Sequence, residues 1–542
     1  MKKLIIYNLA VALIVALGFS ACVNDLDVTP IDPNLDTADK VYDSEEAFLE
    51  VLTKIYAGFA VSGQQGPAGD GDLGGFDEGH SQYWRGYFVS QELPTDEAVN
   101  GWGDPNLPQV SQMLWSSDND YIRSFYYRAI YQVSLANEFI RQANNYGKEE
   151  YTKLSQYKAE ARFLRALSYW HALDLFGNRI PFTTENDAVG SALPMPAGEN
   201  VRGPEVFNYI ESELLAIVGD AEDKSEVLLD PRQGYIGQAD KGAAWMLLTK
   251  LYLNHAVYLG SESSSYYQSA REYVNKVIGA GYSLMTDADA VAGDAYSPYQ
   301  YLFLADNYKC DKEIIYSINY DGDRTRTYGG GTYLLCASIG GSMSAADAGV
   351  ANGWGGNRTT KALVNKFEAG DIRALWHTDG QNLEIEDQSK FTDGYGVTKF
   401  RNRTRDNGFG SNEGKTDWVD FNIPVFRLAD AYLMAAEIDI RLDGTVSGAN
   451  YNYVKEITDR AGATIPPGID LNWLLDERAR ELYWECHRRT DLVRFGKFTK
   501  GYNWPLKGNA LEGMDMDDKY NLMAIPNTDI VANPNLKQNP GY

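Results

Sequence analysis

The sequence predicts an all-α protein, in which a tetratricopeptide-like scaffold of paired helices carries long, loop-rich insertions. Three observations favour this fold class. Side chains follow helical spacing over long segments, as residues 149–176 show with Phe163, Leu167, Trp170 and Asp174. Small residues in the same segment permit a neighbouring helix to approach closely, at Ala159, Ala161, Ala166 and Ala172. Stretches rich in Gly and Asp separate the helical pairs.

The chain opens with the features of an export signal. Lys2 and Lys3 precede an apolar run at 4–19, and small residues lead to Cys22. This ending resembles a lipobox, in which the cysteine becomes an acylated N-terminus that holds the protein on a bilayer. An ordinary secretory signal is the alternative, because Phe19 stands where Leu is more usual.

The elements expected after the signal fall into four regions. Helical patterning covers residues 44–60, 120–146, 149–176, 203–222, 238–258 and 265–280. Short strands are expected at 313–318 and 332–336. Further helices are expected at 426–442, 451–460 and 471–495. We therefore divide the chain into a signal peptide at 1–21, a lipidated flexible tether at 22–40, a helical scaffold at 41–280 with an aromatic-rich loop at 61–109, a loop-rich insertion at 281–420, and C-terminal helices with an irregular tail at 421–542.

Composition excludes several classes of function. A formal charge of −26 argues against nucleic-acid binding, which needs clustered Lys and Arg. Cys310, Cys336 and Cys486 form an odd set without CxxC spacing, so neither a disulfide framework nor a zinc site is indicated. The 37 Tyr and 11 Trp are unusual in so acidic a chain, and many lie in Gly-rich loops where packing explains them less well.

The sequence contains no HExxH, Gly-x-Ser-x-Gly or P-loop motif, so we expect no enzyme and no cofactor. His80, in a loop beside Asp77 and Glu78, is the only histidine that we consider as a metal ligand, and the favoured expectation is that no metal binds there or elsewhere. The enzymatic alternative is a surface glycoside hydrolase, whose two carboxylates stand roughly 5–10 Å apart. Its candidate residues are Asp72, Asp77, Glu78, Asp96 and Glu97.

Segments spread over the chain resemble the RagB/SusD family of Bacteroidetes surface lipoproteins. They include AEARFLRA at 159–166, FRLADAYL at 426–433, ERAREL at 477–482, HRRTDLVRFG at 487–496 and QNPGY at 538–542. The resemblance implies a SusD-like helical scaffold on the outer membrane, exposed at the cell surface. It also implies a SusC-like TonB-dependent transporter as partner and oligomers, usually glycans, as cargo. The alternating charges of 477–494 predict ion pairs along a helix, each contributing roughly 0.2–0.5 kcal/mol.

The loops resemble those of starch-binding members of the family, at 77–79, 92–97, 325–334 and 352–354. By motif position, Trp102, Tyr328 and Trp354 correspond to an arc of aromatic rings beneath a helical α-glucan. Asp77 and Arg85 correspond to residues that bond sugar hydroxyls. Pro105 departs from the family pattern, which has Asn there, so the resemblance leaves fine specificity open.

The chemistry of these residue types favours sugar independently of the resemblance. Pyranose rings present apolar faces and rims of hydroxyls, which aromatic rings and planar charged groups bind. Three platforms at roughly 0.5–1.5 kcal/mol each predict weak binding, with avidity for a polymer from many anchored copies. We expect a non-enzymatic, starch-binding or maltooligosaccharide-binding lipoprotein. The alternatives are another glycan or a peptide as ligand, a lid that binds no sugar, and loop aromatics that only plug the scaffold.

Overall fold

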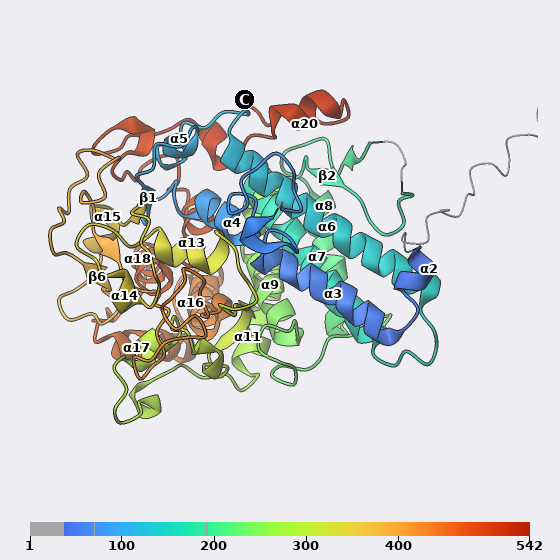
Figure 1. Ribbon diagram of the computed structural model, residues 1–542, viewed down its shortest axis with the longest axis horizontal. Helices are drawn as coiled ribbons and strands as arrows, with labels where there is room; N and C mark the ends of the chain where they lie inside the picture. Colours follow the sequence, from blue (N-terminus) through green and yellow to red (C-terminus); the bar gives the residue numbers. More distant parts are fainter. Residues whose placement is uncertain (1–36, 70, 190–192) are drawn as a thin grey trace, which may run out of the picture.

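The computed structural model describes residues 37–69, 71–189 and 193–542. Helices joined by long loops make up this part of the chain, and its strands form only two-stranded sheets (Figure 1). The predicted all-α class is therefore confirmed. None of the helices in these residues is both long and apolar enough to span a bilayer. Cys22 and the expected signal peptide and tether up to residue 36 lie outside the described residues.

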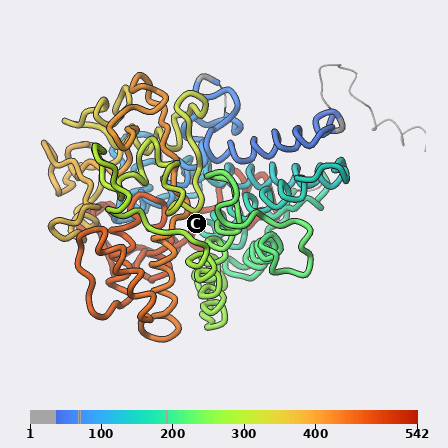
Figure 2. Tube along the Cα trace, turned by 90° about the horizontal axis from the view of Figure 1, so that it is seen from below, coloured from blue at the N-terminus to red at the C-terminus, as the bar shows by residue number. Residues whose placement is uncertain are grey.

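Long helices pack in succession along the chain. They are α3 (Glu45–Ala60), α6 (Asp120–Tyr146), α7 (Leu154–Phe176), α8 (Pro204–Val218), α9 (Lys241–Leu253), α11 (Ser264–Ile278), α16 (Leu428–Asp443), α17 (Gly448–Ala461) and α18 (Leu471–Leu482). From α6 each helix contacts the next as far as α16, which also contacts α17 and α18. Figure 2 shows this progression from the blue α3 on one side, through green helices, to orange helices on the other. Helical repeats that stack on their neighbours have this arrangement.

The remaining elements are short. The helices are α2 (Ala38–Val41), α4 (Tyr83–Gln91), α5 (Leu107–Ser111), α10 (His255–Leu259), α12 (Pro298–Tyr301), α13 (Gly330–Cys336), α14 (Ala345–Ala348), α15 (Lys361–Val364), α19 (Arg488–Arg494) and α20 (Asn527–Ala532). The antiparallel strand pairs are β1 (Val99–Asn100) with β5 (Asn357–Arg358), β2 (Pro181–Phe182) with β3 (Met195–Pro196), β4 (Ile314–Ile318) with β8 (Ile423–Arg427), and β6 (Trp376–His377) with β7 (Gly396–Val397).

Helix α7 lies in the core as its alanines predict. The four alanines are buried, and Trp170 is only 4% exposed. Trp170 Nε1 donates a hydrogen bond to the Tyr258 hydroxyl over 3.0 Å, and that hydroxyl donates to Asp174 over 3.0 Å. A large side chain with a satisfied polar group thus joins α7 to α10.

Two expectations about the loops are wrong. The stretch at 61–109 contains α4, whose nine residues are all buried, and the first residues of α5. A helix surrounded by protein shows no amphipathic period, so its pattern cannot be distinguished from an apolar loop. Residues 332–336 belong to α13 and not to a strand, an ambiguity inherent in short apolar runs. The strand expected at 313–318 is confirmed as β4.

The helix expected at 471–495 is divided into α18 and α19. Trp484 and Cys486 adopt positive φ angles of 65° and 63° between them, which a continuing helix excludes. Trp484 is buried there, and its Nε1 donates to the Glu97 carbonyl over 3.0 Å. The Trp484 side chain at this break therefore connects the C-terminal helices to the segment that follows α4.

The charges of 477–494 are mostly buried. The expected pairs along a helix form between Glu477 and Arg480 over 2.7 Å and between Asp491 and Arg494 over 2.8 Å, but most partners lie on other elements.

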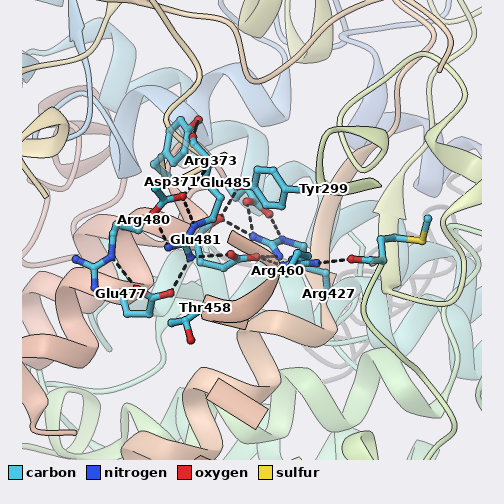
Figure 3. Close-up of polar contacts among 12 residues, drawn as sticks. Tyr299, Asp371, Arg373, Arg427, Thr458, Arg460, Glu477, Arg480, Glu481 and Glu485 are labelled. Atoms are coloured by element: carbon cyan, nitrogen blue, oxygen red, sulfur yellow. Dashed lines mark hydrogen bonds and ion pairs between the residues drawn. The ribbon is translucent and has the colours of Figure 1, made fainter. Parts of the chain in front are cut away.

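Glu481 accepts from Arg427 over 2.6 Å and from Arg460 over 2.5 Å, and it lies 3.1 Å from Arg373 (Figure 3). Arg373 also pairs with Glu477 over 2.7 Å, and all five side chains are at most 2% exposed. Burial alone would raise the pKa of Glu481, but the three guanidiniums outweigh it and lower that pKa to about 2. We call these five residues the charged core.

The irregular tail packs against the scaffold. The Tyr542 hydroxyl accepts from Trp115 Nε1 over 2.6 Å and donates to the Leu522 carbonyl over 2.9 Å. Asn539 Nδ2 donates to the Phe176 carbonyl, which ends α7, over 2.9 Å. Side-chain bonds thus fix a segment with little secondary structure of its own.

Candidate functional site

The structure brings together the three loop aromatics that the sequence singled out. The ring centroids of Trp102 and Trp354 lie 6.5 Å apart with their planes at 41°, and those of Trp354 and Tyr328 lie 6.1 Å apart at 54°. The Tyr328 side chain is 41% exposed, and both tryptophans are half-buried. The three form a row in which each ring is tilted from the next, and we call it the aromatic row.

A two-residue strand pair places Trp102 beside Trp354. β1 and β5 pair antiparallel, and the Gly101 amide extends the pairing by donating to the Gly356 carbonyl over 2.9 Å. Trp102 Nε1 then donates to the Trp354 carbonyl over 3.2 Å. A Cβ at Gly356 would lie 2.6 Å from the Trp102 ring, so this contact requires glycine. Residues far apart in the sequence are thereby held at a fixed separation.

Tyr328 is fixed through its backbone, which leaves the ring at the surface. Its amide donates to Glu78 Oε2 over 2.8 Å, and its carbonyl accepts from Arg85 Nη1 over 3.4 Å. A Cβ at Gly79 would lie 2.6 Å from that carbonyl oxygen, so the close approach again depends on glycine. The loop before α4 and the loop before α13 therefore meet beneath the Tyr328 ring.

The two predicted polar residues occupy different environments. Asp77 is exposed, and its carboxylate accepts from the His80 amide over 3.3 Å. Arg85 is 9% exposed and lies under the row, with its guanidinium carbon 5.7 Å from the Trp102 ring centroid and 4.6 Å from that of Tyr333. Asp77 thus offers a free acceptor at the surface, while Arg85 also supports the rings from below.

Pro105 is exposed in the turn after Trp102. The next residue, Asn106, has a left-handed φ of 71°, and its carbonyl accepts from Asn119 Nδ2 over 2.9 Å. Asn tolerates this conformation better than most residues. The turn is therefore pinned at Asn106, while the proline ring faces solvent.

The sequence did not single out Asp417 and Trp418, which lie beside the row. The Trp418 ring centroid lies 5.0 Å from that of Tyr328, with the planes at 59°. Asp417 accepts from Trp354 Nε1 over 3.2 Å and from the Asn352 amide over 2.9 Å. The available signal was an aromatic next to an acid in a Gly-rich loop, but nothing in the spacing related that loop to Tyr328.

The carboxylates of the hydrolase alternative have structural partners. Asp72 pairs with Lys54 over 2.7 Å, and Asp96 pairs with Arg488 over 2.6 Å. Glu78 accepts from the Ser62 hydroxyl as well as from Tyr328, and Glu97 is buried, which raises its pKa to about 7. Of the five, only Asp77 is exposed. These five residues therefore offer no pair of exposed carboxylates.

His80 lies in an environment unlike that of a metal ligand. Its ring stacks on Tyr121 with centroids 3.9 Å apart, and burial lowers its pKa to about 3, with the nearby Arg85 charge acting in the same direction. Across the residues that the structure covers, no three His, Cys, Asp or Glu side chains are grouped to hold a metal ion. His80 therefore packs as a neutral aromatic ring.

A cavity of about 910 Å³ lies between α3, α7, β4 and the loop at 229–238. Its lining includes none of the five predicted site residues.

Comparison with known proteins places this arrangement in a family. The model of the SusD family matches residues 378–542. The chain is 35% identical to the starch-binding protein SusD of Bacteroides thetaiotaomicron over 99% of this chain and 98% of that protein. It is 26% identical to SusD-like protein P2 of Formosa agariphila over 80% of this chain and 83% of that protein.

Solved structures share the fold. A SusD superfamily protein from Parabacteroides distasonis superposes with a TM-score of 0.69 at 21% identity, covering 92% of this chain and 99% of that one. Surface glycan-binding protein A from Bacteroides thetaiotaomicron, solved with laminarihexaose, superposes with a TM-score of 0.67 at 18% identity, covering 91% and 99%. The resemblance drawn from the sequence is thus confirmed, and the chain belongs to the SusD family.

Proposed function

We propose that this protein binds α-1,4-glucan, as starch or maltooligosaccharides, at the cell surface without cleaving it. The observation that carries the proposal is the aromatic row of Trp102, Trp354 and Tyr328, whose successive planes are tilted by 41° and 54°. The likeness to a starch-binding protein over almost the whole chain supports the same ligand.

The geometry of the row favours a curved ligand. Aromatic platforms stack on the apolar faces of sugar rings, and tilted platforms suit a chain whose successive sugars turn. An α-1,4-glucan coils in this way, whereas a β-1,4-glucan is a flat ribbon. The exposed Asp77 carboxylate is placed to accept from sugar hydroxyls, and the Arg85 guanidinium, 5.7 Å from the centroid of the Trp102 ring, is the candidate donor.

Native electrophoresis in gels that contain a polysaccharide tests this function. Wild-type protein should be retarded by amylopectin, and Tyr328→Ala should migrate as it does without polysaccharide. Tyr308→Ala serves as a matched control, because Tyr308 is also an exposed tyrosine, at 54%, and makes no contact with the row. Retardation by laminarin or a peptide ligand but not by amylopectin would replace starch with that ligand.

The absence of cleavage is part of the proposal. Hydrolysis needs an acid and a base on either side of the glycosidic bond, whereas four of the five candidate carboxylates have partners in the scaffold and only Asp77 is exposed. Prolonged incubation with starch should release no reducing ends. Production of maltooligosaccharides by the purified protein would assign it to the hydrolases.

We further propose that the protein is held on the outer membrane by acylation of Cys22 and passes glycans to a SusC-like TonB-dependent transporter. The expected tether at 22–40 is too long at its C-terminal end, because Ala38–Val41 form helix α2, so only the residues before α2 can serve as the tether. The support is the lipobox-like leader and membership of the family. Cys22→Ala should move the protein from the membrane fraction to the soluble fraction. Unchanged membrane partition of that variant would refute the anchor but not the glycan site.

A further inference from the structure

A hollow of about 510 Å³ adjoins the Tyr328 end of the aromatic row. Residues of α3, the loop at 61–67, the loop at 323–326 and Trp418 line it. Trp418 belongs to both features, since its ring lies 5.0 Å from Tyr328 and also forms a wall of the hollow. The aromatic surface therefore does not end at Tyr328 but turns over Trp418 into a concave space.

Hydrogen bonds hold the walls of this hollow in place. Arg128, buried in α6, donates to the Ser62 carbonyl over 2.7 Å and fixes the start of the 61–67 loop. The Trp418 carbonyl accepts from Asn412 Nδ2 over 2.7 Å. Lys54 in the α3 wall is paired with Asp72 over 2.7 Å. A preformed space of this kind is typical of ligand sites, because little order has to be gained on binding.

The rim of the hollow carries planar polar groups that face solvent. Gln64 and Gln65 are exposed, and so is the guanidinium of Arg326, for which the described part of the chain provides no ion-pair partner. Arg324 is exposed too, with a long 3.6 Å approach to Asp321. Amides and guanidiniums beside an aromatic face are the combination that sugar hydroxyls require.

We propose that this hollow is a second subsite, which binds further sugar residues of a glycan chain that already lies on the aromatic row. The inference rests on the proposed function and extends it. Trp418 supplies the stacking face, and Gln64, Gln65 and Arg326 bond hydroxyls at the rim. A chain with a free end reaches the subsite, whereas a closed ring of sugars seated on the row has no end to extend into it.

Calorimetric titration with two α-glucans tests the subsite. For Trp418→Ala, linear maltodecaose should bind about threefold to tenfold more weakly than to wild type, the loss expected for one stacking platform. β-Cyclodextrin should bind within about twofold of wild type, since it occupies the row alone. Arg326→Ala, which leaves the Trp418 and Tyr328 rings in place, should also weaken maltodecaose selectively.

Tyr328→Ala and Tyr308→Ala serve to distinguish loss of the subsite from loss of the aromatic row. Tyr328→Ala should weaken both ligands because it removes part of the row, and Tyr308→Ala should change neither. Equal losses of both ligands in Trp418→Ala, with none in Arg326→Ala, would mean that Trp418 only supports Tyr328 and would overturn the subsite. Wild-type affinity of both variants for maltodecaose would overturn it while leaving the row intact. If wild-type protein binds no α-glucan, the proposed function fails and the subsite fails with it.

Discussion

The charged core and the aromatic row are assembled in the same way, but they differ in whether their side chains are paired inside the protein or exposed to solvent. Each collects side chains from segments far apart in the sequence. In the charged core every guanidinium meets a carboxylate, so that Glu481 alone serves Arg373, Arg427 and Arg460. In the row the ring of Tyr328 is left 41% exposed. Satisfied groups stabilise the scaffold, and the groups left unsatisfied are available to a ligand.

This difference makes stability and binding separable. Burial of ions is costly unless each is paired, so removing one partner leaves uncompensated charge in the interior. An exposed ring on a loop adds little to the free energy of unfolding. Changes in the charged core should therefore alter stability with little effect on the site, and changes in the row should do the reverse.

The largest effect is expected from Glu481→Gln. The three guanidiniums that pair with Glu481 would lose the negative charge of its carboxylate. We therefore expect the free energy of unfolding to fall by about 3–5 kcal/mol in denaturant titrations. The affinity of the folded fraction for starch should stay at the wild-type value. Glu512→Gln is the control, because Glu512 pairs with Lys361 over 3.0 Å but is 79% exposed, and it should change stability by about 0–1 kcal/mol. A Glu481→Gln variant as stable as this control would contradict the role of the charged core.

Two tryptophans sharpen the comparison. Trp354→Ala should weaken starch binding about tenfold or more, as removal of the central ring of the row requires, with a small change in the thermal midpoint. Trp170→Ala should leave affinity unchanged and cost about 3–5 kcal/mol of stability, because that ring fills the core. Calorimetry and thermal unfolding of both variants measure the contrast. A large fall in midpoint for Trp354→Ala would make Trp354 a structural plug.

The sequence predicted those parts of the molecule that leave a local pattern. Helix α6 was expected at its observed bounds, because helical patterning marks it. The structure adds the cap at its start, where the Asn119 side chain accepts from the amides of Tyr121 and Ile122. Helix α4 was missed, because a helix buried on all sides has no such period. The break before α19 was missed as well, since the left-handed Trp484 becomes favourable only through its contact with Glu97.

The candidate site shows the same limit. Trp102, Tyr328 and Trp354 were predicted because their loops carry recognisable motifs, and the structure brings them together. Trp418 has no motif, and only the tertiary approach of its loop to Tyr328 reveals it. The alternating acidic and basic residues of 477–494 form a sequence pattern that occurs both on exposed helices and in protein cores. Only the elements packed against α18 determine that Glu481 is buried.

The smallest expected effect is a difference in pH dependence. Burial lowers the pKa of His487 from 6.5 to about 3, and the positive charge of Lys250, 3.4 Å away, acts in the same direction. Arg478 also lowers that pKa, while Asp430 and Glu485 oppose the shift. The folded protein keeps this histidine neutral, so the unfolded chain binds the extra proton below pH 6.5. Stability should therefore decline as the pH falls from 6.5 towards 3.

Denaturant titrations at pH 7 and pH 5 test this expectation. His487→Gln should lose less stability than wild type over that interval, by at most about 1.4 kcal/mol for each pH unit. Starch affinity should be the same at both values, because the indole rings of the row do not titrate. Equal losses in variant and wild type would show that His487 does not remain neutral in the fold.

Ligand shape provides the most direct test of the central claim, that a tilted aromatic row binds a coiled α-glucan. We propose calorimetric titration of the wild-type protein with β-cyclodextrin, linear maltoheptaose and cellohexaose. The cyclic glucan is already curved and loses less conformational entropy on binding, so it should bind at least as tightly as maltoheptaose, while cellohexaose should give no heat. Equal affinity for cellohexaose, or no heat from either α-glucan, would contradict the claim.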